Sequence, residues 1–192
     1  LFVAEGAKVV EDLLHFMRCK TLFATEEYSA SLSYSIRPKV SDIEVVDAAQ
    51  LKKLSNLSTP RDVVAVFEKK TVATDVDELA GLPGKMLCLA LDGVQDPGNL
   101  GTIIRLADWF GIEHIFASRD TADMYSPKVV QATMGAIARV AVHYVDLPCV
   151  LSRAAESGAA GYGTFFDGAE MYAQSLEHKG VKVMGNEGNG KT

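Results

Sequence analysis

The feature that most constrains the fold of this chain is a regular alternation of short apolar segments and amphipathic segments from Met86 onward. Residues 86–91 are all apolar, which is typical of a buried strand, and residues 99–110 repeat apolar side chains at helical spacing. The alternation continues with expected strands at 113–117, 140–145, 159–163 and 181–184 and expected helices at 127–134 and 150–156. Strands and helices that alternate in this way predict a mostly parallel sheet with helices on both faces.

Residues 1–70 predict a second, smaller α/β unit, close to the lower size limit for independent folding. Asp47 is placed to cap a helix. The expected helices are 6–16 and 48–54, and the expected strands are 21–25, 43–46 and 63–67. Residues 71–85 are polar and acidic and then contain the turn-forming run Gly81-Leu82-Pro83-Gly84, which predicts a linker. The predicted domains are therefore 1–70 and 86–192, joined by 71–85.

Charge and composition exclude several classes of protein. The net charge of −6 argues against a nonspecific coat for nucleic acid. No apolar run approaches the roughly 18 residues of a membrane helix, and no secretory signal is visible, so we expect a cytoplasmic protein that does not enter a membrane.

The three cysteines lie far apart in the sequence among apolar neighbours: Cys19, Cys88 and Cys149. This predicts buried free thiols in a reducing compartment. The four histidines show no metal-ligand spacing, so we expect no metal.

The segment 96–105 is the first candidate site, because it joins an expected strand to an expected helix. Loops at this position bind ligands in open α/β sheets. The Pro-Gly pair at 97–98 predicts a tight turn, and Asn99 is a residue type that caps helices.

Arg105 falls on the side of this helix away from its apolar stripe and shares that side with Trp109, a residue typical of interfaces. The stripe consists of Leu100, Ile103, Ile104, Ala107 and Phe110. Two interpretations of Arg105 stay open at this point. It is a residue of a binding or catalytic site, or it is a surface arginine paired with Asp108 one turn later.

The segment 185–192, Gly-Asn-Glu-Gly-Asn-Gly-Lys-Thr, is the second candidate site, because it follows the last expected strand. Its spacing satisfies the pattern of a phosphate-binding loop, with Lys191 and Thr192 in the phosphate and magnesium positions. Such a loop opens a helix, however, and none follows in this sequence, while Glu187 would repel phosphate. The other interpretations are a glycine-rich loop that admits a neutral or cationic ligand, and a plain surface turn.

Together the two segments resemble the SpoU-type branch of the SPOUT superfamily of RNA ribose methyltransferases. The first motif is Asp96-Pro97-Gly98-Asn99-Leu100-Gly101-Thr102-Ile103-Ile104-Arg105, and the second is Met184-Gly185-Asn186-Glu187-Gly188-Asn189-Gly190. The segments Phe2–Gly6, Leu51–Ser55 and Thr59–Phe67 resemble the ribosomal-protein-like RNA-binding domain attached to many of these enzymes. The resemblance therefore covers nearly the whole chain.

The resemblance implies an S-adenosylmethionine-dependent methyltransferase that modifies a ribose 2′-hydroxyl in structured RNA, with ribosomal RNA favoured over transfer RNA. It implies a catalytic Arg105 positioned with the help of Asn99, no metal, and a homodimer whose knotted faces pack together. The cofactor-binding residues that it implies are Gly185, Asn186, Glu187 and Gly188. Candidate phosphate contacts in the first domain are Arg18, Lys20, Arg37, Lys39, Lys52, Lys53 and Arg61.

The departure from the family lies at the end of the chain. The family's third motif, which completes a trefoil knot and the cofactor pocket, would begin soon after Thr192. The expected fold is therefore a small α/β RNA-binding domain followed by a mostly parallel SPOUT domain of the trefoil-knot type, with the C-terminal part of the knot missing from this sequence. The alternative functions are a noncatalytic RNA-binding relative and, through Lys191 and Thr192, a nucleotide hydrolase.

Overall fold

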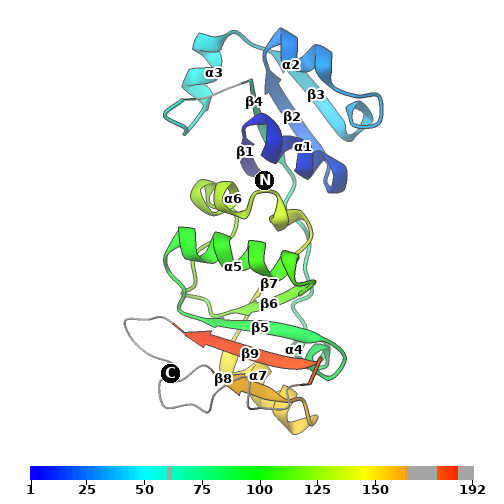
Figure 1. Cartoon of the computed structure of the whole chain (residues 1–192), viewed down its shortest axis with the longest axis vertical. Coiled ribbons are helices and arrows are strands. Elements are labelled where there is room, and N and C mark those ends of the chain that lie inside the picture. Colours follow the sequence, from blue (N-terminus) through cyan, green and yellow to red (C-terminus); the bar gives the residue numbers. More distant parts are fainter. Residues whose placement is uncertain (60–61, 164–176, 186–192) are drawn as a thin grey trace. The chain divides into compact units, whose positions relative to one another are not determined.

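The computed structural model describes residues 1–59, 62–163 and 177–185 (Figure 1). The chain divides into two compact units. Unit 1 contains Leu1–Lys70 together with Asp123–Arg139, and unit 2 contains Thr71–Ala122 together with the chain from Val140 onward. Residues 123–139 thus belong with the N-terminal unit, although the sequence analysis assigned them to the second domain.

Unit 1 is built on a four-stranded mixed sheet with the strand order β1-β4-β2-β3. The strands are β1 (Phe2–Glu5), β2 (Cys19–Ala24), β3 (Val40–Val45) and β4 (Val63–Phe67). Strand β4 pairs antiparallel with β1 and with β2, and β2 pairs parallel with β3. The helices of this unit are α1 (Ala7–Phe16), α2 (Glu26–Ser31), α3 (Ala48–Leu54) and α6 (Pro127–Thr133), with 3-10 turns at Arg37–Lys39 and Ala136–Ala138.

The helices of unit 1 follow from local sequence signals. The apolar residues of α1 recur at helical spacing, and four of them are buried: Val9, Val10, Leu13 and Leu14. Helix α3 begins at a capping box. The Asp47 carboxylate accepts a hydrogen bond from the backbone N–H of Gln50 at 2.8 Å, and the side-chain oxygen of Gln50 accepts one from the backbone N–H of Asp47 at 2.9 Å. The predicted cap at Asp47 is confirmed.

Unit 2 contains a five-stranded, wholly parallel sheet with the strand order β7-β6-β5-β9-β8. The strands are β5 (Leu87–Asp92), β6 (His114–Ala117), β7 (Ala141–Tyr144), β8 (Gly161–Gly163) and β9 (Gly180–Gly185). The prediction of a mostly parallel sheet is confirmed. Strand β9, the last in the described sequence, lies beside β5, the first strand of this sheet.

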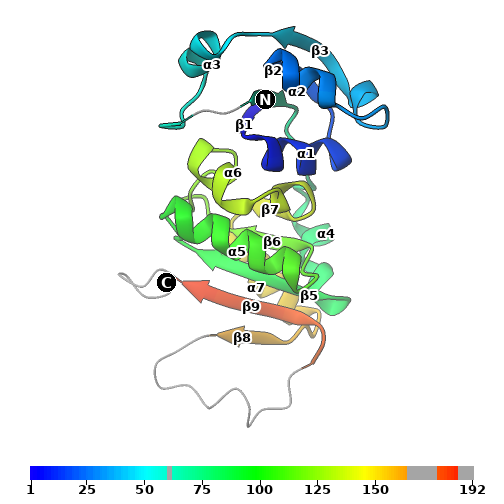
Figure 2. The same cartoon turned by 45° about the horizontal axis from the view of Figure 1, so that its top comes forward.

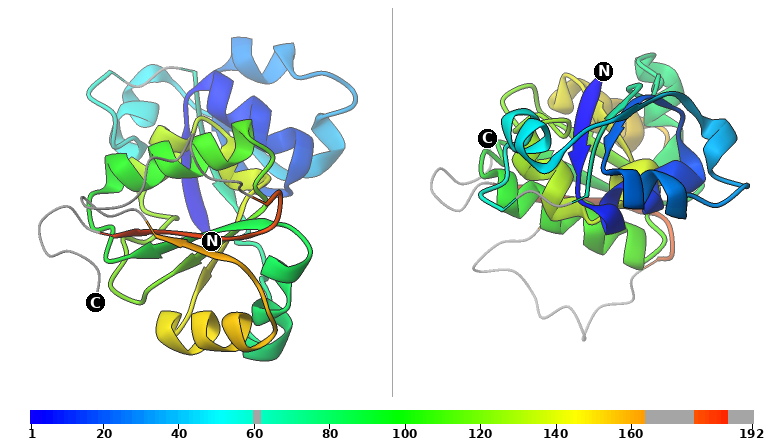
Figure 3. Two further views of the ribbon diagram at one scale, coloured as in Figure 1. Left: turned by 60° about the horizontal axis from the view of Figure 1, so that its bottom comes forward. Right: turned by 90° about the horizontal axis from the view of Figure 1, so that it is seen from above.

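The two faces of this sheet carry different helices. Figure 3 shows α5 (Pro97–Trp109) on one face and both α4 (Val76–Ala80) and α7 (Leu147–Glu156) on the other. Side chains alternate along a strand, so Cys88 and Ala90 of β5 point to the same face, where they pack with Leu79 of α4 and Val150 of α7. The fully buried Leu79 is part of this core.

Two sequence-based expectations differ from the structure. Residues 71–85 were expected to form a linker, but they contain α4 and a 3-10 turn at Leu82–Gly84, and the apolar side of α4 packs into the core of unit 2. Cys149 was expected to be buried, but it is exposed in the first turn of α7, while Cys19 and Cys88 are buried as free thiols. The assignment of separate functions to the two domains stays a prediction.

Membrane and metal features were searched within the described part of the chain. None of its helices combines the length and the hydropathy needed to cross a membrane. Among the same residues, no three side chains of histidine, cysteine, aspartate or glutamate gather as a metal site would require.

Candidate active site

The loop after β5 and the first turn of α5 form the first wall of the candidate site. The Asp96 carboxylate accepts from the backbone amide of Asn99 at 2.7 Å and caps the helix, and Pro97 occupies the first turn. The sequence analysis expected Asn99 to be the cap. Asn99 is instead the third residue after the cap. Its backbone amide donates to the Asp96 carboxylate, and its side chain is exposed.

The loop between β5 and α5 is tied to the loop that follows β6. The Gly93 amide, at a φ of 65°, donates to the Ser118 hydroxyl at 2.8 Å, and the Ala122 amide donates to the Val94 carbonyl at 3.0 Å. The Ser118 and Thr121 hydroxyls lie 3.1 Å apart. Sequence reasoning did not find these two residues, because serine and threonine in a loop carry no signal of their partner.

The two sequence motifs meet at a hollow of about 270 Å³ beside the start of α5. Strands β5 and β9 pair in parallel register with Asp92 opposite Gly185, so the chain leaves both strands at the same edge of the sheet (Figure 2). The hollow is lined by Val94, Gln95, Asp96, Asn99, Thr102, Ile103, Met184 and Gly185. Asn99 and Gly185, which are 86 positions apart in sequence, therefore share one site, as expected of the carboxyl ends of adjacent parallel strands.

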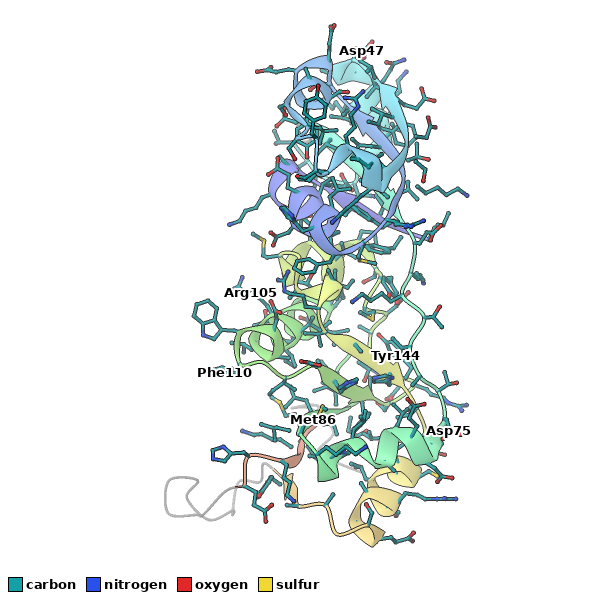
Figure 4. All side chains as sticks on the ribbon, turned by 90° about the vertical axis from the view of Figure 1, so that its right-hand side faces the viewer. Asp47, Asp75, Met86, Arg105, Phe110 and Tyr144 are labelled. Carbon is teal, nitrogen blue, oxygen red and sulfur yellow. The ribbon has the colours of Figure 1, made fainter. Side chains whose placement is uncertain are left out.

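Arg105 lies farther along α5 and does not line this hollow. Its side chain is exposed (Figure 4), as are large apolar side chains of the same helix: Leu106 (50% exposed), Trp109 (83%) and Phe110 (72%). The expected apolar stripe is only partly confirmed, because Leu100, Ile104 and Ala107 are buried, whereas Ile103 is half-buried and Phe110 is exposed. The C-terminal end of helix α5 thus carries an unusual amount of exposed apolar surface.

The remaining predicted residues divide into those that the structure describes and those that it does not. Asn186, Glu187 and Gly188 of the second motif lie outside the described residues, as do Arg61 and the Lys191-Thr192 pair. Lys52 and Lys53 are exposed in the last turn of α3, and Arg37 is exposed in the turn before β3. The Lys39 ammonium donates to the carbonyl of His15 at the end of α1.

These predicted RNA contacts do not form one cluster. Strands β2 and β3 are parallel, with Cys19 opposite Val40 at their start and Ala24 opposite Val45 at their end. Arg37 and Lys39 precede the start of β3, whereas α3, which carries Lys52 and Lys53, follows its end. Arg37 and Lys39 therefore lie at the opposite end of this strand pair from Lys52 and Lys53.

The buried thiols have no nucleophilic role. Burial raises the pKa of Cys19 to about 11 and the pKa of Cys88 to about 12. The thiolate is the reactive form, so both side chains are unreactive near neutral pH.

Comparison of the chain with known proteins identifies its family. Residues 86–192, more than half of the chain, match the model of the SpoU rRNA Methylase family. That range contains all the residues named above as lining the hollow, and it also contains Arg105. The chain belongs to the SpoU rRNA methylase family. The resemblance stated from the two motifs is thereby confirmed.

Individual relatives extend the likeness to unit 1. The 23S rRNA (guanosine-2′-O-)-methyltransferase RlmB of Ralstonia nicotianae is 33% identical over 148 residues, which are 75% of this chain and 59% of that protein. A structure from the TrmH family of RNA methyltransferases, from Porphyromonas gingivalis, is 36% identical with a TM-score of 0.83, covering 100% of this chain and 74% of the other. An AdoMet-bound rRNA methyltransferase from Sinorhizobium meliloti is 27% identical with a TM-score of 0.77, covering 98% and 71%. The chain thus spans less than two thirds of the RlmB relative.

Proposed function

We propose that this protein transfers a methyl group from S-adenosylmethionine to a ribose 2′-hydroxyl of RNA, with ribosomal RNA favoured as the substrate. The observation that carries the proposal is the meeting of Asn99 and Gly185 at one hollow, in a chain of the SpoU family. The name of the RlmB relative adds support, since it specifies 2′-O-methylation of 23S rRNA. We also propose that the protein acts in the cytoplasm, in keeping with the bacterial source of this relative.

The hollow suits the proposed cofactor in its chemistry. Apolar side chains of Val94, Ile103 and Met184 line it together with polar side chains of Gln95, Asn99 and Thr102. S-adenosylmethionine suits this mixture, because its base is flat and weakly polar while its ribose and amino-acid groups form hydrogen bonds. Gly185, Asn186, Glu187 and Gly188 would hold the cofactor, and a carboxylate such as Glu187 is compatible with a sulfonium cation. When bound, S-adenosylmethionine supplies an already activated methyl group, so we propose that no metal takes part.

Arg105 is the proposed catalytic residue. A ribose hydroxyl becomes a good nucleophile only as it loses its proton, and a fixed guanidinium stabilises the negative charge that develops on the oxygen. A guanidinium is almost always protonated, so electrostatic stabilisation is the role that its chemistry favours. Asn99 would position the substrate or Arg105 at the mouth of the hollow.

We propose that the active protein is a homodimer, because Arg105 does not line the hollow of its own chain. It shares an exposed helix side with Trp109, and the exposed Leu106 and Phe110 add apolar area near the same end of the helix, as is typical of an interface. A second protomer packed against α5 would bring Arg105 of one chain to the cofactor hollow of the other. RNA would be recognised in addition by the basic residues of unit 1.

The test is methyl transfer by an Arg105→Ala variant. We expect at least about 100-fold slower transfer of radiolabelled methyl groups to ribosomal RNA, in line with the loss of one preorganised charge-stabilising donor. Calorimetry should show a largely unchanged affinity for S-adenosylmethionine, because the proposed role of Arg105 is to stabilise charge on the RNA hydroxyl oxygen and not to hold the cofactor. Arg153→Ala, which removes an exposed arginine from α7 on the face of the sheet opposite α5, is the matched control and should transfer normally.

Three results would reject parts of this proposal. Near-normal transfer by Arg105→Ala would remove Arg105 from the mechanism. Uptake of ATP instead of S-adenosylmethionine by the wild-type protein would reject the methyltransferase and favour a nucleotide hydrolase. RNA binding by a protein that takes up neither compound would favour a noncatalytic RNA-binding relative.

A further inference from the structure

Helix α1 ends on an exposed aromatic ring. Val9, Val10, Leu13 and Leu14 of this helix are at most 3% exposed, whereas Phe16 is 56% exposed. The guanidinium of Arg139 lies over the Phe16 ring, 5.0 Å from its centroid. A cation over an aromatic face is a favourable contact, and it holds the ring in one orientation at the surface.

A basic hollow of about 420 Å³ lies beside this ring. It is lined by Phe16, Met17, Arg18, Pro38, Lys39 and Ser41. All six residues are among those that the structure describes, and two are cationic while none is acidic. This grouping is notable in a chain with a net charge of −6. We refer to Phe16, Arg18, Lys39 and Arg139 as the Phe16 cluster.

Lys39 has a fixed place in this cluster. Its ammonium donates to the carbonyl of His15 in the last turn of α1, where the negative end of the helix dipole favours a cation. An ammonium has three N–H donors, so two more can bind an anion. Arg18, the second cation of the lining, is exposed two residues beyond the end of α1.

We propose that the Phe16 cluster binds an unpaired nucleotide of RNA, with the base stacked on the Phe16 ring and the flanking phosphates on Arg18 and Lys39. An unpaired base presents a flat apolar face together with negative charge on both sides, and an exposed ring between cations complements both features. A base inside a duplex is already stacked on both faces by its neighbours, and an acidic peptide offers charge without a flat face. This inference rests on the proposed function only in taking RNA as the substrate.

The first experiment measures the affinity of the protein for a short fluorescein-labelled oligouridylate by anisotropy. Phe16→Ala should weaken binding by about 5-fold to 100-fold, the range that stacking of one base contributes. Phe16→Tyr should bind as the wild type does, because it keeps the ring. Both variants should fold, since the side chain is largely exposed.

The second experiment separates this surface from a general attraction of RNA to cations. Arg18→Ala should weaken binding and reduce the magnitude of the slope of log affinity against log salt by about 0.7, as expected for one phosphate contact to a single strand. The matched control is Lys85→Ala, which removes an exposed cation from unit 2. Equal losses in Arg18→Ala and Lys85→Ala would overturn the proposal, because the attraction would then be nonspecific.

The third experiment reports stacking directly. Phe16→Trp places an indole at this position in a chain whose one other tryptophan is Trp109. Oligouridylate should quench its fluorescence more strongly than that of the wild type, while an RNA duplex of equal length and polyglutamate should not. Quenching by polyglutamate, equal quenching by the duplex, or unchanged oligouridylate affinity in Phe16→Ala would each reject the site.

These outcomes are distinct from failure of the proposed function. If the wild type takes up S-adenosylmethionine and methylates RNA while Phe16→Ala binds oligouridylate normally, only the Phe16 site is wrong. If the wild type binds oligouridylate through Phe16 but takes up no S-adenosylmethionine, the methyltransferase proposal is wrong and the site stands.

Discussion

His143 shows at the scale of single residues how a buried polar side chain is accommodated in unit 2. It is 2% exposed, and its Nδ1 lies 2.9 Å from the carbonyl of Ala73, which can only accept. Nδ1 must therefore donate, and in the neutral ring Nε2 accepts from Nδ1 of His114 at 3.0 Å. The neutral form of His143 thus satisfies both of its nitrogens.

Protonation of His143 should destabilise the fold. Burial, with a smaller contribution from His114, holds the pKa of His143 below its ordinary value of 6.5. The unfolded chain then binds more protons than the folded chain as the pH falls below about 6.5. We expect the free energy of unfolding, measured with urea, to decrease from pH 7.5 to pH 5, and to decrease less in His143→Phe.

Two groups on neighbouring elements bear on this titration. The Ala73 carbonyl and the carboxylate of Glu78 on α4 raise the pKa of His143 and so oppose the burial effect. His178→Gln, which removes an exposed histidine from unit 2, should leave the pH dependence as in the wild type. An identical pH dependence in His143→Phe and the wild type would contradict the prediction.

The start of α5 shows at the scale of the element how local chemistry places a site residue. The Asp96 carboxylate satisfies the amide of Asn99, and Gly98 leaves room for that contact, since a Cβ at Gly98 would lie 3.1 Å from the Asp96 oxygen. The cap therefore depends on an acidic residue and a glycine two positions apart. Sequence reasoning found the turn and the helix but selected the wrong capping residue, because Asp and Asn are equally good caps.

Removal of this cap should destabilise α5. Asp96→Ala should lower the free energy of unfolding by about 1 kcal/mol, the usual cost of a lost N-cap. Asp96→Ser should recover most of the loss, because a hydroxyl also accepts from the amide. Urea unfolding of the three proteins is the measurement, and equal stability of Asp96→Ala and the wild type would show that the cap is not needed.

At the scale of the whole molecule, the arrangement of strands brings the two motifs together. Strand β9 lies between β5 and β8, so residues about ninety positions apart along the chain become neighbours. The chain leaves β5 and β9 at the same edge of the sheet because the two strands are parallel. This neighbourhood creates the hollow that holds Asn99 and Gly185.

Assembly is the prediction that belongs to this scale. Sedimentation should show a dimer at micromolar concentration, and Trp109→Ser should weaken association by about 30-fold or more, as for a central interface tryptophan. Tyr34→Ser is the control, since Tyr34 of unit 1 is 99% exposed and away from α5 in sequence. A wild-type protein that sediments only as a monomer would contradict the proposed dimer.

The sequence by itself determined most elements of this protein and the identity of its motifs. Residues 63–67 are a strand in both the prediction and the structure, and Asp47 begins α3, because strand propensity, helical spacing and capping act between residues close in the chain. Helix α4 was not predicted, because its sequence is mostly polar and acidic and only Leu79 and Ala80 of this short helix are buried. The assignment of Asn99 and Arg105 to the site stays a prediction that rests on the motif.

Only the tertiary structure decided which residues become neighbours. It grouped residues 123–139 with unit 1, placed β9 beside β5, and left Arg105 away from the hollow of its own chain. It also separated Lys39 from Lys52 and put Arg139 over Phe16. Contacts of this kind depend on packing between elements distant in sequence. Local spacing and propensity do not indicate which two surfaces will pack together.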